Sequence, residues 1–164
     1  MPLPEPHSLT FKAFSPEYCQ QLRSWFTTPE QIIFWSGYKF GHPATLNEFA
    51  NQLKLVSIPA YAMLSADGQL IGFGQMMFDN GRCHLVRVAV SPAFRGQGYG
   101  KMLLNCLYLQ GQKLHQPRYF SLFVNKKNAS AIKLYVKAGF QATRYHGVLP
   151  NDNSWYMEKP VLQK

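Results

Sequence analysis

Apolar and polar positions along the first third of the chain predict one strand followed by helices. Residues 8–14 alternate in polarity, as a half-buried strand does. Two Ser/Thr-Pro pairs then supply an N-cap followed by proline at the first helical position, and Thr45 and Glu48 have the spacing of a capping box. We therefore expect a strand at 8–14, a helix from Pro16 to about Phe26, a short helical segment after Thr28 and a third helix from Leu46.

The middle of the chain is patterned as three antiparallel strands. Residues 61–66 and 69–78 are strand-like runs separated by Asp67 and Gly68, a pair that favours a tight hairpin turn. A second turn at 79–81 leads into a third run at 82–90.

Helices and strands alternate in the second half. Apolar residues between Tyr99 and Leu107 form one helical face, and a further helix is predicted from Asn128 to a stop at Gly139. Strands are predicted at 119–124, 140–148 and 154–159. This order predicts an α/β (α+β) fold, a single domain with a mixed, mainly antiparallel sheet of about seven strands and helices on both faces.

Composition excludes several classes of protein. The 164 residues, 46% of them hydrophobic, fit one compact core. No run of about 18 apolar residues is present to span a membrane, and Met1 to His7 lacks the basic-then-apolar order of a secretory signal. The chain has three cysteines, Cys19, Cys83 and Cys106, an odd number without a CxxC pair. We expect a cytoplasmic protein with reduced thiols, no metal and no membrane partner.

The net charge of +9 is confined to one stretch of the chain. Residues 80–151 hold eleven basic residues and no Asp or Glu, whereas the rest of the chain holds six basic and eight acidic residues. Such an excess indicates an anionic partner. The charges are scattered over several predicted elements rather than gathered in one recognition element, so a nucleic acid is the less favoured anion.

A glycine-rich turn lies inside this acid-free stretch. A predicted strand ending at Val90 leads into Gly96, Gly98 and Gly100, directly at the start of a helix. Glycines let backbone amides turn toward one point, and a helix N-terminus attracts phosphate. The spacing is neither that of a Walker A loop nor that of GxGxxG. The turn predicts a phosphate site, with a flexible connection as the alternative.

Two patterns in this region occur together. Arg95, Gly98 and Gly100 follow Arg/Gln-x-x-Gly-x-Gly/Ala, and downstream an Asn-x-x-Ala-x-x-x-Tyr pattern ending in Gly-Phe is formed by Asn128, Ala131, Tyr135, Gly139 and Phe140. In this order they resemble the acyl-CoA motifs of the GNAT (GCN5-related N-acetyltransferase) family, over about residues 58–160. The resemblance implies one domain over 1–164, with residues 1–57 flanking an acceptor site and residues 58–160 forming an acetyl-CoA-binding core.

Acetyl-CoA is the co-substrate that the resemblance implies. Amides of residues 96–101 would cradle its pyrophosphate, and the edge of residues 88–90 would pair with its pantetheine arm. Acetyl-CoA carries about four negative charges, which agrees with the acid-free stretch. The implied cofactor-binding residues are Val88, Ala89, Val90, Arg95, Gly96, Gln97, Gly98, Tyr99, Gly100, Lys101, Asn128 and Tyr135.

Tyr135 stands at the position of the family's catalytic acid. A phenol with a pKa of about 10 stays protonated at neutral pH, so it would donate a proton or a hydrogen bond to the departing thiolate. The alternative is a core tyrosine at helical spacing from Ala131 and Ile132. Asn128 would contact CoA, and the alternative is that it only caps its helix.

The general base does not follow from the resemblance. Family members often use a Glu on the fourth or fifth strand, which the acid-free stretch forbids, and Phe123 stands where relatives that acetylate protein N-termini have a Glu. His84, expected on the same alternating face as Val86 and Val88, is the catalytic candidate, and a packed histidine is the alternative. Open alternatives for the base are Asp79, Asp152, Glu30 and a water chain.

Aromatic residues mark the region that corresponds to the family's acceptor wall. They either stack on an amine or pack the helices together, and they are Trp25, Phe26, Phe34, Trp35, Tyr38, Phe40 and Phe49.

Residues and resemblance together predict an acetyl-CoA-dependent N-acetyltransferase. A primary amine would attack acetyl-CoA in one ternary complex, with the oxyanion held by a backbone amide near Val90. The alternative is a non-catalytic CoA-binding sensor or regulatory module. The sequence leaves open whether the acceptor is a small molecule or a protein N-terminus, and whether the chain forms a homodimer.

Overall fold

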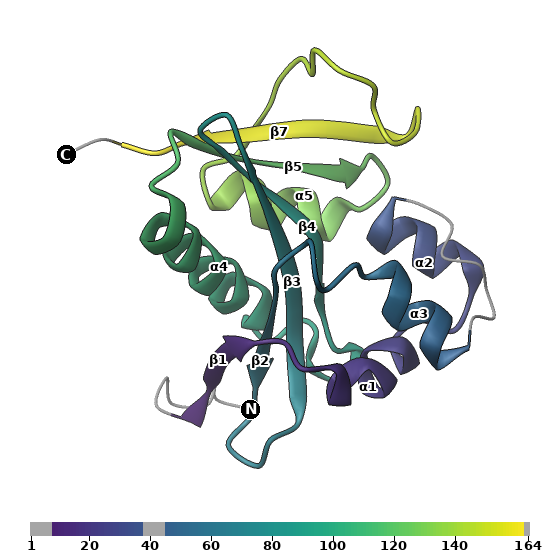
Figure 1. Ribbon diagram of the computed structural model, residues 1–164. Coiled ribbons are helices and arrows are strands. Elements are labelled where there is room, and N and C mark those ends of the chain that lie inside the picture. Colours follow the sequence, from purple (N-terminus) through teal and green to yellow (C-terminus); the bar gives the residue numbers. More distant parts are fainter. Residues whose placement is uncertain (1–7, 38–44, 163–164) are drawn as a thin grey trace.

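The computed structural model describes residues 8–37 and 45–162. Short 3-10 turns at Pro16–Tyr18 and Pro92–Phe94 accompany the main elements. In chain order these are β1 (Thr10–Ala13), α1 (Cys19–Ser24), α2 (Pro29–Ser36), α3 (Leu46–Gln52), β2 (Ala60–Leu64), β3 (Leu70–Asp79), β4 (Arg82–Val90), α4 (Tyr99–His115), β5 (Tyr119–Asn125), α5 (Ala129–Lys137), β6 (Gln141–Ala142) and β7 (Ser154–Pro160) (Figure 1).

The seven strands form one sheet in the order β1-β2-β3-β4-β5-β7-β6. Neighbouring strands are antiparallel except β4 and β5, which run parallel. A parallel pair needs a crossover, and α4 supplies it between β4 and β5. The predicted mixed, mainly antiparallel sheet of about seven strands is confirmed.

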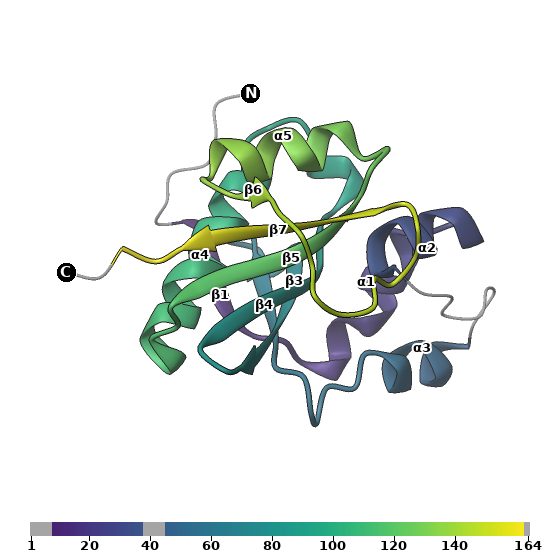
Figure 2. The ribbon, with the colours of Figure 1, turned by 90° about the horizontal axis from the view of Figure 1, so that it is seen from above.

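Helices cover both faces of the sheet and divide the core in two. Figure 1 shows α4 on one side and α1, α2 and α3 on the other, and Figure 2 shows α5 running alongside β5 and β7. Leu103 and Leu107 of α4 are fully buried against the first face, and Leu22 and Phe49 of the N-terminal helices against the second. No helix within the described ranges is long and apolar enough to cross a membrane.

Of the three helix start signals in the first third of the chain, two form side-chain caps, whereas Ser15 makes no side-chain capping hydrogen bond. The Thr28 hydroxyl accepts a hydrogen bond from the Gln31 amide, and Thr45 and Glu48 form both halves of a capping box. The helix expected from Pro16 to Phe26 is instead a 3-10 turn followed by the six residues of α1.

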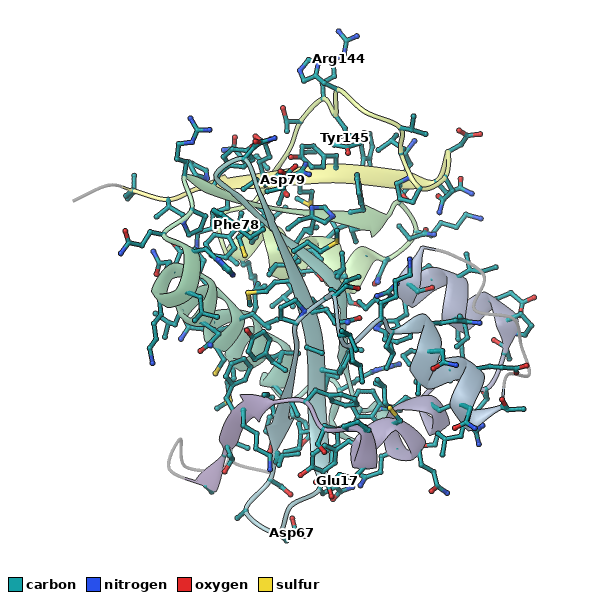
Figure 3. The ribbon with its side chains drawn as sticks, in the orientation of Figure 1. Glu17, Asp67, Phe78, Asp79, Arg144 and Tyr145 are labelled. Atoms are coloured by element: carbon teal, nitrogen blue, oxygen red, sulfur yellow. The ribbon has the colours of Figure 1, made fainter. Side chains whose placement is uncertain are left out.

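The strand expected at 140–148 is wrong beyond its first residues. The ladder with β7 includes Gln141 and Ala142, followed by one hydrogen bond from the Thr143 amide to the Tyr156 carbonyl, and β6 is the outer strand of the sheet among the described residues. The chain then leaves this edge, and the Tyr145 ring packs against Phe123 and Tyr156 at centroid distances of 5.1 and 4.7 Å. Figure 3 shows Arg144 pointing outward and Tyr145 turned toward the sheet.

Candidate functional site

Strands β4 and β5 lie side by side for only part of their length. Their pairing runs from Arg82 with Tyr119 to Leu85 with Leu122. Beyond Leu85, β4 continues to Val90 without β5 beside it, while β5 continues along β7. The two strands therefore diverge, and the edge of β4 that faces β5 is left unpaired.

A bulge in β4 lies next to this divergence. Phe73 pairs with Ala89 and Gln75 pairs with Val86, so one residue of β3 faces two of β4. Arg87, inside the bulge, has a left-handed φ of 54°. A bulge inserts a residue and shifts the side-chain alternation that follows it.

The bulge overturns one expectation about the faces of β4. Ala89 packs against the core of the N-terminal helices, whereas Val88 and Val90 pack against the core of α4 and α5. His84 lies on the face of α2, so His84 and Val88 point to opposite sides of the sheet. Their expected common face is wrong, because strict alternation cannot account for an inserted residue.

Side chains from three elements hold the bulge in place. The Trp35 indole nitrogen on α2 donates to the Arg87 carbonyl at 2.8 Å. The Arg87 guanidinium donates to Gln75 Oε1 at 2.8 Å, and the Gln75 amide donates to the Leu53 carbonyl just after α3, also at 2.8 Å. These hydrogen bonds connect helices α2 and α3 to β4 at the point where it diverges from β5.

The glycine-rich turn follows β4 and ends at the N-terminus of α4. Gly96 and Gly98 have φ of 73° and 89°, which only glycine adopts without strain. Gly98 is the N-cap residue, and the first-turn amides that follow it have no acceptor within the helix. A Cβ at Gly100 would lie 3.2 Å from Leu134 of α5, so a glycine there lets the two helices approach. Arg95 donates to the Val90 carbonyl at 3.0 Å.

A cavity of about 450 Å³ lies between β4, this turn and α5. We call it the α5 cavity. It is lined by Val88, Ala89, Val90, Arg95, Gly96, Gly100, Asn128 and Tyr135, among others. Eight of the twelve expected cofactor-binding residues thus meet at one place, whereas the other four, Gln97, Gly98, Tyr99 and Lys101, lie in the turn and in the first turn of α4 without lining it.

The N-cap of α5 and one residue within α5 are polar motif residues that border the α5 cavity. Asn128 caps the helix, since its side-chain oxygen accepts from the Ala131 amide at 3.2 Å. Tyr135 is 8% exposed and packs edge-on against Phe140. Burial raises the pKa of Tyr135 to about 12, so its phenol is protonated throughout the neutral range.

His84 lies in a second cavity, of about 540 Å³, bordered by α2 and the end of β5. We call it the β5 cavity. The His84 ring is 7% exposed, its Nδ1 is 2.7 Å from Ser121 Oγ, and Phe123 packs against it. Desolvation, with the charge of Arg82 acting in the same direction, lowers the pKa of His84 to about 4. The histidine is therefore neutral at physiological pH.

The two catalytic candidates lie in neighbouring cavities. Tyr135 lines the α5 cavity and His84 the β5 cavity, and the side chains that border both are Phe34 and Trp35. A ligand that reaches from one cavity to the other has to pass these two rings.

None of the carboxylates left open as a base lines either cavity. Glu30 is exposed in the first turn of α2, Asp79 at the end of β3, and Asp152 in the loop before β7. Glu158 of β7 is not among the predicted candidates; it pairs in register with Ser121 and accepts a hydrogen bond from the Tyr156 hydroxyl at 2.8 Å. Strand register alone aligns it with Ser121, and Ser121 in turn with His84, so the sequence carries no signal for it.

The N-terminal aromatics divide between core and cavity. Phe49 is buried among the helices, and Trp25 and Phe26 are buried but also border the α5 cavity. Trp35 stacks on Phe26 at 4.2 Å. Phe34 is 41% exposed and borders both cavities. Tyr38 and Phe40 lie outside the described residues.

No cysteine lines either cavity within the described part of the chain. Cys19 and Cys83 are buried free thiols, and Cys106 is half-buried on α4. Burial raises the pKa of each thiol, to about 12 for Cys83. Residues 8–37 and 45–162 contain no cluster of His, Cys, Asp and Glu suited to a metal ion.

Curated relatives match about half of the chain. N-alpha-acetyltransferase 20 of Dictyostelium discoideum is 32% identical over 77 residues, which are 47% of this chain and 44% of that protein. Spermine/spermidine N(1)-acetyltransferase of Bacillus subtilis (strain 168) is 31% identical over 83 residues, 46% of this chain and 55% of that protein. The chain thus spans about half the length of the curated relatives it matches.

Similarity in structure extends over nearly the whole chain. Spermidine N-acetyltransferase from Vibrio cholerae, solved in complex with CoA and spermine, superposes with a TM-score of 0.74 at 17% identity, covering 94% of this chain and 96% of that one. At this identity the match concerns the fold. The profile of the acetyltransferase (GNAT) family matches residues 19–140, a range that includes the diverging strands, the glycine-rich turn and α5. By this match and by its fold, the chain belongs to the acetyltransferase (GNAT) family.

Proposed function

We propose that the protein is an N-acetyltransferase that moves the acetyl group of acetyl-CoA to a primary amine within one ternary complex. The observation that carries this proposal is the α5 cavity, where the unpaired edge of β4, the N-terminus of α4 and Tyr135 meet. A helix N-terminus favours phosphates, and an unpaired strand edge offers backbone groups to the amide-bearing pantetheine arm. The α5 cavity holds acetyl-CoA, and the β5 cavity receives the amine.

The transfer itself needs no metal. The amine nitrogen attacks the thioester carbonyl carbon, a C–N bond forms, and the oxyanion accepts a hydrogen bond from a backbone amide of β4 near Val90. The C–S bond then breaks and the electron pair leaves on sulfur. Tyr135 donates to this thiolate, and because its pKa is about 12 against about 8.5 for a thiol, a strong hydrogen bond accounts for its effect without full proton transfer.

Proton removal from the amine falls to the β5 cavity. In the tautomer in which His84 Nδ1 donates to Ser121, the Nε2 lone pair is free to accept a hydrogen bond from the amine. A pKa of about 4 means that His84 holds a proton only transiently and releases it to solvent. We therefore propose that His84 orients the neutral amine and passes the proton of the amine to solvent.

The test is product analysis by mass spectrometry after incubation with acetyl-CoA and a mixed library of primary amines. Equal amounts of free CoA and of an N-acetylated amine are expected. Mass detection identifies the acetylated amine directly, which a thiol reagent for free CoA does not. Tight binding of acetyl-CoA without any acetylated product would instead identify a non-catalytic CoA-binding module.

A further inference from the structure

The β5 cavity is cationic. Lys54, Arg82 and Arg87 line it, and none of its described lining residues is Asp or Glu. Residues 38–44, which lie outside the described ranges, contain no acidic residue in the sequence either. A cavity with three positive charges and no negative one disfavours a cationic ligand and favours an anionic one.

The nearest acidic residues do not offset these charges inside the cavity. Asp79 and Asp152 are exposed, at the end of β3 and in the loop before β7. The Glu158 carboxylate accepts a hydrogen bond from Tyr156 and is not part of the lining. Glu17 and Asp67 lie at the opposite end of the molecule (Figure 3).

The three cations occupy different parts of the cavity. Arg87 lies in the β4 bulge, where the Trp35 indole contacts its backbone and the α5 cavity begins. Arg82 lies at the other end of β4, beside the rings of Tyr145 and Tyr156. Arg82 and Val86 are four positions apart, which is about 13 Å of strand. Lys54, after α3, is exposed at the rim.

From this distribution, and resting on the proposed acetyl transfer, we propose that the acceptor is a primary amine that carries a carboxylate at its far end. The amine lies where Phe34 and Trp35 separate the two cavities, and the carboxylate lies toward Arg82 and Lys54. Neighbouring cations also disfavour the ammonium form of the amine, which promotes the neutral form needed for attack in a cavity without a carboxylate base. The polyamines named for some relatives fit this lining poorly.

Three amines of equal length test the charge at the far end. They are 6-aminohexanoate, hexylamine and 1,6-diaminohexane, whose distal groups are negative, apolar and positive. We expect kcat/KM to fall in that order, with at least a tenfold difference between the first and the last at low salt. The preference should shrink in 500 mM NaCl, because part of the cavity is open to solvent.

A charge reversal locates the preference in the cavity. Lys54→Glu, at an exposed position, should lower the ratio of kcat/KM for 6-aminohexanoate over 1,6-diaminohexane about fivefold, the size expected for one partly exposed charge. The control is Lys12→Glu, which changes the net charge equally on β1, away from both cavities. Its ratio should match that of the unmodified protein.

The tripeptide amides Gly-Gly-Glu and Gly-Gly-Lys distinguish a small-molecule carboxylate from one on a peptide. Preference for the Glu peptide over 6-aminohexanoate assigns the carboxylate to a peptide acceptor, and the reverse assigns it to a small molecule.

Binding measured by tryptophan fluorescence keeps this inference separate from the proposed function. Trp35 borders both cavities, so ligands in either should alter its emission. Equal or tighter binding of 1,6-diaminohexane, spermidine or spermine overturns the inference even where acetyl transfer occurs. If no amine is acetylated but 6-aminohexanoate binds in preference to the diamine, the proposed function fails and the anionic preference of the cavity stands.

Discussion

At the scale of single residues, burial favours the neutral form of both catalytic candidates. It raises the pKa of Tyr135 to about 12 and lowers the pKa of His84 to about 4, because an apolar environment penalises whichever form is charged. Both side chains are therefore neutral across the physiological range. A neutral phenol that donates and a neutral imidazole that accepts suit the opposite ends of the proposed transfer.

Replacing Tyr135 by Phe removes one hydroxyl and keeps the ring that packs on Phe140. We expect kcat to fall about a hundredfold, the lower range for a positioned proton donor, while the dissociation constant for acetyl-CoA changes less than threefold. Steady-state kinetics and calorimetric titration measure the two quantities. An unchanged kcat would remove Tyr135 from the mechanism.

His84 should make the fold sensitive to acid. In the unfolded chain histidine binds a proton near pH 6.5, and in the folded protein only near pH 4, so the free energy of unfolding decreases as the pH falls between these values. The full loss is about 3 kcal/mol. Urea unfolding at pH 7 and at pH 4.5 measures how much of the free energy of unfolding is lost between the two. This loss should be about 2 kcal/mol smaller for His84→Gln than for the unmodified protein.

The control for this measurement is His115→Gln on α4, where the histidine ring stacks on Phe78 outside both cavities. A loss in the His84→Gln variant equal to that of the unmodified protein would contradict the low pKa of His84.

At the scale of elements, β4 decides where the chemistry can take place. Its first half pairs with β5, its bulge turns Val88 away from the face of His84, and its last residues run unpaired into the glycine-rich turn. The hydrogen bonds that Trp35 and Gln75 make with Arg87 hold the bulge of β4 in place. One irregular strand thereby separates the acetyl-CoA side of the proposed site from the acceptor side.

Substitutions at Gly98 separate backbone strain from charge at the start of α4. The φ of 89° strains any other residue, so Gly98→Ala should weaken acetyl-CoA binding, and Gly98→Asp should weaken it at least tenfold more by placing a carboxylate against the phosphates. Calorimetric titration measures both affinities, and circular dichroism verifies that α4 persists. If Gly98→Asp binds as Gly98→Ala does, the phosphates lie elsewhere.

At the scale of the whole molecule, the basic residues behind the net charge of +9 line two cavities rather than one. The acid-free stretch contributes Arg95 beside the α5 cavity and both arginines of the β5 cavity. Acetyl-CoA and the proposed acceptor both carry anionic groups, which one continuous stretch without Asp or Glu favours in both cavities.

Acetyl-CoA binding should therefore depend on ionic strength. Raising NaCl from 50 to 500 mM should weaken the affinity about tenfold, because salt screens exposed charges around the phosphates. The slope should be smaller for the analogue without the 3′-phosphate, measured by the same titration. Equal slopes would mean that the 3′-phosphate is not held by the basic stretch. Binding of random duplex DNA that persists at saturating CoA would restore the nucleic-acid interpretation.

Much of this molecule follows from its sequence, because caps, turns and glycines act locally. The capping box at Thr45, the left-handed Gly98 and the Asn128 cap are decided by neighbours within four residues, and all are present. The strand expected at 140–148 fails for the opposite reason. Whether an edge segment continues as a strand depends on a partner far away in the chain.

Tertiary structure alone decides how the chemical groups are arranged. Nothing near Arg87 in the sequence announces a bulge, which depends on pairing with β3 and on the Trp35 indole 52 residues away. The place of Glu158 beside Ser121, and of Tyr135 and His84 in separate cavities, depends on strand register and on the divergence of β4 from β5. The sequence by itself determined the family, most of the elements and the sign of the charge, because these depend on residue type and local spacing. Which groups face the acceptor was decided by long-range packing, which no local pattern encodes.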